Sequence, residues 1–442
     1  MNNNRISESF NHRALQKSEF FKSLLTLITG TVLAKFLGFL LMPILARLYS
    51  KEAFGLFTSF SAMVSLISSY ATLKYDTAIV LPEEEKEAYA LLKLSFYISA
   101  LLICVSCLVL CIPIPYFKEY NHLQFLIALG AGFSINCNIS ELWNIRKKEF
   151  RITTKAKIIQ SLGIFLFQLA FYFIYKDKVT GLIIGNICGF VLSGLYLIII
   201  RRRLVQKSIR NSITREDLKS AANRYKDFPK YFVWSNIILN LSSNLPVLLF
   251  AKSIPLDLLG LYGVALRIVD QPVSLISTNV QSIIMSYMPE RKKAQMPILK
   301  WYLRITLFLF MISLAGCFII IWKGEELASF FLGKEWAQAG TIIKSMLPML
   351  IGSMIASPAT ASVRVFEMQK YTLFYSILSF SIKLISLILL LYFNIKFELL
   401  IFIYSTISLL IILYNNIIII KKIIKYEKNI YSKINNKESI SI

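Results

Sequence analysis

Charged side chains inside long apolar segments are the residues of this sequence best able to do chemistry. Four basic residues lie within such segments: Lys35, Arg267, Lys344 and Lys383. A charge at the bilayer centre costs roughly 2.5–3.5 kcal/mol on insertion scales, so it usually faces a cavity or a partner. Cations in a water-poor cavity would bind phosphate oxygens through charge-assisted hydrogen bonds. We select Lys35, Arg267 and Lys383 as candidate anion-binding residues, because Lys344 is near enough to a helix end to reach the interface.

Acidic side chains inside the apolar segments are fewer, so the predicted membrane interior is net positive. Arg267 and Asp270 are one helical turn apart and can pair, which would lower the cost of burying both. A purely structural ion pair is the alternative for these two residues. Asp76 and Glu141 lie toward the cytoplasmic ends of the second and fourth predicted helices. We select Asp270 and Asp76 as candidate charge partners or coupling groups.

Enzymatic and metal chemistry have little support in the sequence. There are two histidines, and the six cysteines lie in apolar runs without a histidine or carboxylate at zinc spacing. The sequence contains no GxxxxGK[ST] phosphate-binding pattern. The longest connection predicted on the outer side, residues 323–339, has no nucleophile beside a base. We expect no enzyme, metal site or cofactor, and we leave coupling to H⁺ or Na⁺ open.

The elements that must position these residues are long apolar helices. Apolar residues other than glycine make up 56% of the 442 positions, above the ~45–50% usual for soluble domains. A helix needs about 20 mostly apolar residues to cross a bilayer. The segments that reach or approach this length begin near Leu24, Phe54, Leu91, Leu123, Ile158, Val179, Tyr231, Leu259, Tyr302, Gly340, Tyr371 and Leu399. We therefore predict an all-α polytopic membrane protein with about twelve transmembrane helices.

The net charge of +24 is distributed in a way that indicates orientation. Most Lys and Arg residues fall in alternate connections between the apolar segments, as the positive-inside rule expects. This pattern argues against a nucleic-acid partner and favours the lipid bilayer. It also predicts a multi-pass protein whose N- and C-termini are both cytoplasmic.

The longest basic connection divides the predicted helices into two sets of six. It covers residues 201–230 and separates an N-terminal half, residues 1–200, from a C-terminal half with its tail, residues 231–442. Thr214 and Asp217 within it have the spacing of a helix capping motif. We favour instead a solvated basic loop near anionic lipid headgroups.

Four short strings resemble those of a known family. They are KYDTAIVLPEEEKEA at Lys74–Ala88, ELWNIRKKEF at Glu141–Phe150, RYKDFPKYFVWSNIILNLSSNLPVLLF at Arg224–Phe250 and FFLGKEWAQAG at Phe330–Gly340. Together they span most of the chain. They resemble strings of polysaccharide biosynthesis proteins, the oligosaccharide flippases that export O-antigen and capsule units.

The resemblance implies a fold and a substrate. The fold is that of MOP-type exporters, with two six-helix bundles around a central cavity that opens alternately inward and outward. The substrate is an oligosaccharide on undecaprenyl pyrophosphate, carried from the cytoplasmic to the periplasmic leaflet of a bacterial inner membrane. A polymerase and a chain-length regulator of the same pathway are candidate partners. A multidrug or cation antiporter of the same superfamily, a membrane-bound polysaccharide polymerase or ligase, and a non-transporting scaffold remain alternatives.

Overall fold

The computed structural model divides the chain into two compact units, Met1–Asn240 and Leu241–Ile442, which are described separately. It describes residues 32–438 apart from 111–122, 176–177, 205–211 and 367. Regular secondary structure in that part of the chain is helical. The predicted start of the first helix near Leu24 lies outside the described residues.

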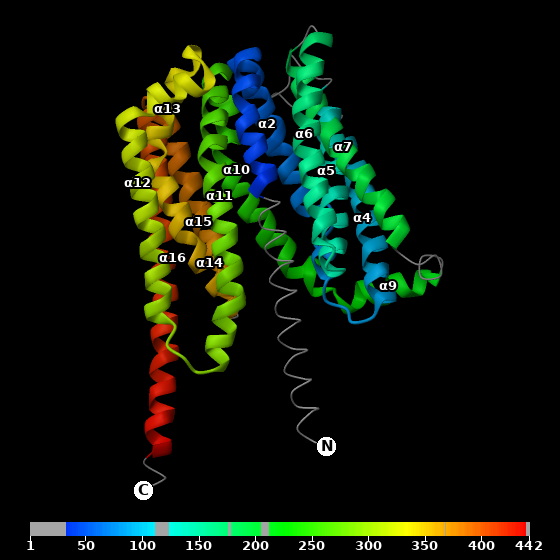
Figure 1. Ribbon diagram of the computed structural model, residues 1–442, viewed down its shortest axis with the longest axis vertical. Helices are drawn as coiled ribbons and strands as arrows, with labels where there is room; N and C mark the ends of the chain where they lie inside the picture. Colours follow the sequence, from blue (N-terminus) through cyan, green and yellow to red (C-terminus); the bar gives the residue numbers. More distant parts are fainter. Residues whose placement is uncertain (1–31, 111–122, 176–177, 205–211, 367, 439–442) are drawn as a thin grey trace. The chain divides into compact units, whose positions relative to one another are not determined.

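The first unit is a bundle of long helices with short elements between them (Figure 1). Its elements are a helix over residues 32–48, α2 (Lys51–Tyr70), α3 (Tyr75–Ala78), α4 (Glu85–Leu110), α5 (Leu123–Arg146), α6 (Phe150–Ile174), α7 (Lys178–Leu204), α9 (Arg215–Arg224), η2 (Phe228–Phe232) and the first turns of α10 (Val233–Ser253). Ser50 caps α2 by accepting a hydrogen bond from the Ala53 amide at 3.3 Å.

The second unit is also a bundle of long helices (Figure 1). Its elements after α10 are α11 (Leu256–Lys293), α12 (Leu299–Leu332), η3 (Lys334–Trp336), α13 (Ala337–Ser345), α14 (Leu347–Val365), α15 (Gln369–Tyr392) and α16 (Phe397–Glu438). Helices α11, α12, α14 and α16 share a buried cluster around Tyr302 and Ile419. Glu427 of α16 accepts hydrogen bonds from the amides of Ile298 and Leu299, at 2.6 and 2.7 Å, and so caps the start of α12.

The outer faces of the helices are apolar, which confirms the prediction of an all-α multi-pass membrane protein. Ten described helices are long and apolar enough to cross a membrane, and a bent pair raises the number to 11. A further helix over residues 32–48 begins at the edge of the described part of the chain. On α12, Phe318, Trp322 and Phe330 are 67%, 71% and 82% exposed. Soluble monomers rarely expose apolar patches of this extent, whereas lipid covers them without cost.

Helices α6 and α7 pack closely because α7 presents two glycines one turn apart. A Cβ on Gly185 would lie 2.6 Å from the backbone nitrogen of Gln168, and one on Gly189 would lie 2.7 Å from that of Ile164. Small residues four positions apart allow membrane helices to approach backbone to backbone. The Gln168 side chain also donates to the Leu182 carbonyl at 2.9 Å, which fixes the register of the pair.

Two short regions differ from the sequence-based predictions. The helix predicted to begin near Gly340 is broken into Lys334–Ser345 and Leu347–Val365, which are bent by 55°, because Pro348 at the start of α14 cannot donate to a preceding turn. The solvated loop favoured around Thr214 was wrong, since α9 forms there. Thr214 and Asp217 make a reciprocal capping box that satisfies its first amides.

Candidate functional site

A polar cavity of about 390 Å³ lies inside the first unit, and we call it the serine–asparagine cavity. Its walls come from α2, α5, α7 and α10. Most lining side chains carry a hydroxyl or an amide. The lining residues are Phe60, Ser61, Val64, Ser65, Ser68, Ser69, Lys74, Ser134, Asn138, Asn186, Phe190, Asn236 and Asn240.

The polar lining residues face the cavity because they recur at helical spacing. Ser134 and Asn138 are four residues apart on α5, and Asn236 and Asn240 are four residues apart on α10. Side chains at this spacing lie on one face of a helix. Asn186 adds an amide from α7. The cavity is therefore lined by groups that both donate and accept hydrogen bonds.

Hydrogen bonds between α2 and α10 hold one wall of this cavity. The Ser65 hydroxyl donates to Oδ1 of Asn240 at 3.0 Å. The side-chain amide of Asn240 in turn donates to the backbone carbonyl of Asn236 at 3.2 Å. The Asn236 amide donates to the Ser69 carbonyl at 3.0 Å. The buried Ser68 hydroxyl has no hydrogen-bond partner among the described residues. The wall is thus ordered before any ligand binds, and it keeps one polar group unsatisfied.

Lys74 is the single charged residue among those that line the cavity. It follows α2 in the left-handed region, with φ of 62°, and the preceding Leu73 also has a positive φ of 47°. Burial lowers the pKa of the Lys74 ammonium, and the nearby Asp76 carboxylate opposes part of that shift. The described hydrogen bonds of Lys74 are made by its backbone, with Thr72 and Thr77. The ammonium has no ion-pair partner within 4.0 Å in the described part of the chain.

Asp76 is placed differently from its predicted position in the second spanning helix. The left-handed residues Leu73 and Lys74 end the helical path after α2, so Asp76 lies in the separate short helix α3. Asp76 is 8% exposed, and its carboxylate accepts a hydrogen bond from the Thr72 hydroxyl at 2.8 Å. Asp76 is therefore near Lys74 in the chain but is already hydrogen-bonded locally.

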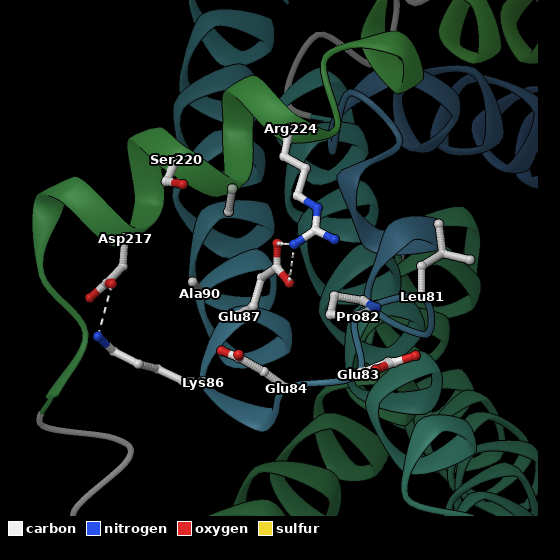
Figure 2. A pocket seen from close by; sticks show the side chains of 11 residues that line it. Leu81, Pro82, Glu83, Glu84, Lys86, Glu87, Ala90, Asp217, Ser220 and Arg224 are labelled. Carbon is white, nitrogen blue, oxygen red and sulfur yellow. Dashed lines mark hydrogen bonds and ion pairs between the residues drawn. The ribbon is translucent and has the colours of Figure 1, made fainter.

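The first unit has a second hollow, a groove of about 530 Å³ between α9 and the start of α4. Figure 2 shows the two ion pairs that hold α9 there: Lys86 with Asp217 at 2.9 Å, and Arg224 with both Glu87 oxygens at 2.9 and 3.0 Å. The contact with Lys86 and the capping hydrogen bonds with Thr214 lower the pKa of Asp217 to about 2. The groove therefore forms where α9 docks on α4.

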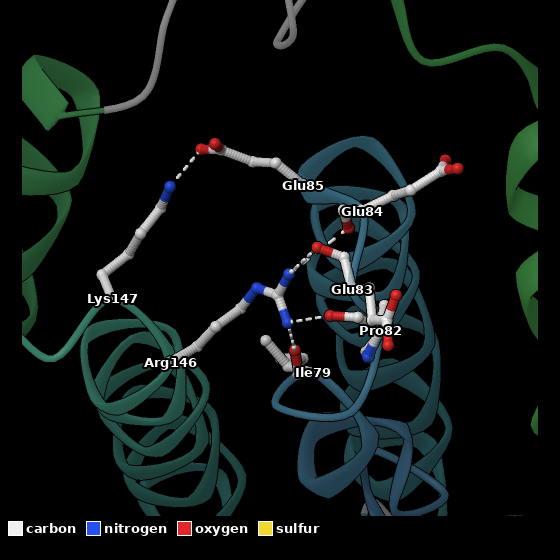
Figure 3. A network of polar contacts seen from close by, with 7 residues as sticks. All are labelled: Ile79, Pro82, Glu83, Glu84, Glu85, Arg146 and Lys147. Atoms are coloured by element: carbon white, nitrogen blue, oxygen red, sulfur yellow. Dashed lines mark hydrogen bonds and ion pairs between the residues drawn. The ribbon is translucent and has the colours of Figure 1, made fainter. Parts of the chain in front are cut away.

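Arg146 at the end of α5 fixes the turn that leads from α3 to α4 (Figure 3). Its guanidinium donates to the carbonyls of Ile79, Glu83 and Glu84 at 3.3 Å each, and also to that of Pro82. The adjacent Lys147 forms an ion pair with Glu85. We call the surface formed by residues 79–87, residues 146–149 and α9 the linker face.

The cations selected from the sequence lie on different elements. Lys35 is half-buried on the helix over residues 32–48 of the first unit. Arg267 and Asp270 lie one turn apart on α11, and Lys383 lies on α15, all in the second unit. Helix α11 packs chiefly on α14, whereas α15 packs chiefly on α16. The Lys383 ammonium has no hydrogen-bond or ion-pair partner among the described residues. The binding roles of these residues remain predictions.

Two other charges near the membrane are paired. Lys344 forms an ion pair with Glu325 at 2.9 Å. Glu141, whose side chain is 14% exposed, forms one with Lys157 at 3.3 Å. Both pairs join two consecutive membrane segments, so these residues have structural partners.

The serine–asparagine cavity was not predicted from the sequence, because charged residues stand out at membrane depth and most residues of the cavity are uncharged. Single serines and asparagines occur in membrane helices as helix-packing residues. The available signal was the recurrence of Ser or Asn at four-residue spacing, as in Ser134 with Asn138 and Asn236 with Asn240.

A family model described as "Polysaccharide biosynthesis protein" matches residues 44–341. The comparison with curated proteins gives no match.

Several solved membrane transporters share the fold. An inward-facing multidrug resistance MATE family transporter of the MOP superfamily matches with a TM-score of 0.64 and 14% identity, covering 91% of this chain and 95% of the other. An outward-facing multidrug resistance MATE family transporter of the MOP superfamily matches with a TM-score of 0.60 and 14% identity, covering 93% of this chain and 96% of the other. A MOP superfamily transporter from Pyrococcus furiosus, described as having a binding pocket of reverse polarity, matches with a TM-score of 0.58 and 15% identity. The match covers 90% of this chain and 95% of the other.

Proposed function

We propose, since the chain belongs to the family of polysaccharide biosynthesis proteins in the MOP exporter superfamily, that it is a flippase for lipid-linked oligosaccharides. Its substrate is an oligosaccharide repeat unit on undecaprenyl pyrophosphate. The flippase carries this head group from the cytoplasmic to the periplasmic leaflet of a bacterial inner membrane, for O-antigen or capsule synthesis. The linker face lies in the cytoplasm in this proposal, because it belongs to the more basic set of connections.

The chemistry of the serine–asparagine cavity supports this proposal. Sugars present hydroxyl groups that donate and accept hydrogen bonds, and serine hydroxyls and asparagine amides complement both roles. The cavity volume of about 390 Å³ is within the ~300–1,000 Å³ typical of ligand sites. An organic cation would be better held by carboxylates, and the one charged lining residue is Lys74.

The pyrophosphate is assigned to the basic residues of the membrane helices. Lys35, Arg267 and Lys383 would bind phosphate oxygens by charge-assisted hydrogen bonds. Asp270 and Asp76 would balance these charges or take part in coupling. Outward movement of an anion is favoured by the usual membrane potential, so coupling to H⁺ or Na⁺ would serve to drive release or return.

A second candidate function is a multidrug or cation antiporter. It is favoured by one observation, the fold shared with multidrug resistance MATE transporters. At 12–15% identity this similarity describes the fold alone. Drug-sensitivity profiles of a deletion strain separate this function from the flippase.

Deletion of the gene tests the proposal. The deletion strain is expected to lose surface glycan and to accumulate lipid-linked repeat units on the cytoplasmic leaflet, and the wild-type gene should reverse both effects. Lys35→Ala and Arg267→Ala should lower surface glycan while their membrane abundance stays at the wild-type level. A clean deletion with unchanged surface glycan would refute the flippase function.

A further inference from the structure

We infer that the serine–asparagine cavity binds an acidic sugar, a sugar ring with one carboxylate, and that the Lys74 ammonium binds this carboxylate. This inference rests on the proposed function and adds the chemical class of the glycan. It makes Lys74 a specificity-determining residue within the repeat unit.

The backbone at Lys74 indicates that the position is built for its side chain. Leu73 and Lys74 are consecutive residues with positive φ, at 47° and 62°, where glycine or asparagine would be the low-cost choice. Each such residue costs on the order of 1–3 kcal/mol unless the surroundings hold it. Here the Lys74 amide donates to Thr72 and its carbonyl accepts from Thr77. The fold thus holds a lysine in a costly conformation at the edge of a polar cavity.

The Lys74 ammonium is available for a ligand. The neighbouring carboxylate of Asp76 accepts a hydrogen bond from Thr72 at 2.8 Å and makes no ion pair with Lys74 within 4.0 Å. The other lining residues are uncharged. A partly buried cation without an ion pair is unfavourable, and one carboxylate in direct contact would stabilise it.

The rest of the cavity fits the neutral part of a sugar. Asn236 and Asn240 are held in place by their own hydrogen bonds, so they can bind hydroxyl groups with little loss of side-chain entropy. The unpartnered Ser68 hydroxyl offers one further polar contact. Phe60 and Phe190 add apolar surface for the carbon face of the ring.

A phosphate of the lipid carrier is the other anion that could occupy this cavity. Pyrophosphate joined to a lipid and a sugar carries about two charges, and such a group usually takes several basic residues or a metal ion. The cavity lining provides one cation among nine neutral polar residues and three apolar ones. The observed balance of charge and hydroxyl-binding groups therefore favours a sugar carboxylate.

Binding to the purified full-length protein in detergent tests this inference. The probes are D-glucuronate, D-glucose and inorganic pyrophosphate, measured by saturation-transfer NMR and by ligand-dependent thermal shift. Wild-type protein should bind glucuronate about tenfold or more tightly than glucose, as one charge-assisted contact predicts. Lys74→Met should remove this preference, and Lys74→Arg should keep most of it.

Lys148 provides a matched control. It is also a lysine in the left-handed region, with φ of 59°, but it is exposed on the linker face and does not line the cavity. Lys148→Met should leave the glucuronate preference unchanged. The wild-type preference alone tests the inference if Lys74→Met fails to fold.

Two results would overturn the inference: equal binding of glucose and glucuronate by wild type, or pyrophosphate binding that is stronger and depends on Lys74. Failure of the proposed function is read separately in cells. If the deletion removes surface glycan but Lys74→Met restores it fully, the flippase function stands and the acidic-sugar site does not. If the deletion leaves surface glycan intact, the flippase function itself fails.

Discussion

Replacement of Arg146 by alanine is expected to destabilise the first unit more than its position on a turn suggests. The guanidinium donates to four backbone carbonyls between residues 79 and 84. Ile79 and Pro82 are buried, so water cannot readily reach their carbonyls, whereas Glu83 and Glu84 are exposed. A buried acceptor left without a donor costs about 1–3 kcal/mol. Counting only the two buried carbonyls, Arg146→Ala should cost about 2–6 kcal/mol.

Thermal unfolding of the purified full-length protein in detergent measures this loss. For a unit of this size, about 2–6 kcal/mol corresponds to a fall in Tm of roughly 4–24 °C. The Tm of Arg146→Lys should lie between those of wild type and Arg146→Ala. An ammonium keeps the charge but lacks the planar guanidinium that reaches several carbonyls. Arg151→Ala is the matched control, since Arg151 is exposed on α6 and has no side-chain partner among the described residues.

The control should change stability by less than about 0.5 kcal/mol, as surface substitutions usually do. If Arg146→Ala and Arg151→Ala unfold at the same temperature, the four carbonyl contacts do not hold the turn. If Arg146→Lys has the wild-type Tm, the positive charge alone holds the turn and the planar guanidinium is not required.

Three further predictions concern helix contacts, each within one of the two units. Gly189→Ala should push α6 from α7 and cost about 1–3 kcal/mol in thermal unfolding, whereas Gly316→Ala, with nothing within 4 Å of its Cβ, should be neutral; equal Tm values would contradict this. Glu427→Gln should weaken the cap of α12 by about 1 kcal/mol, and an unchanged Tm would show that water replaces the cap. Asp217→Asn should expose α9 to hydrogen exchange or protease equally at pH 7 and pH 5, because ion pairing lowers the pKa of Asp217 from 3.8 to about 2. In wild type, the stabilising effect of the Asp217 carboxylate should disappear only as the pH falls from about 3.8 through about 2. A loss of this effect already between pH 7 and pH 5 would contradict the pairing.

Hydropathy predicted the long helices well because lipid imposes their length and apolar surface. The helix predicted near Leu399 begins two residues earlier, at Phe397, and the helix predicted near Leu259 begins three residues earlier, at Leu256. The bend before Pro348 was missed because apolar residues continue on both sides of it. Helix α9 was missed for the opposite reason: its basic composition favoured a loop, but the cap formed by Thr214 decided its structure.

The candidate site was harder to predict because its residues are individually ordinary. A lysine at membrane depth is conspicuous in sequence, so Lys35 and Lys383 could be selected. A single serine or asparagine is not conspicuous in sequence. The cavity also depends on four helices meeting at matching heights. Lys74 follows the end of an apolar helix, where sequence alone predicts a lysine directed to the interface. The left-handed backbone of Lys74, and its place in the lining of the cavity, are visible only in the folded chain.

Three of the strings that carried the family resemblance meet in the first unit, close in the chain to Lys74. The first string begins at Lys74 and continues into the turn held by Arg146 of the second string. Arg224, which begins the third string, docks α9 on Glu87 of the first. Because this turn follows α3 directly, loosening it should disturb Lys74 as well as lower stability. Arg146→Ala should therefore weaken glucuronate binding, whereas Glu427→Gln, in the second unit, should lower Tm and leave that binding unchanged; loss of binding in both variants would mean that global instability alone explains it.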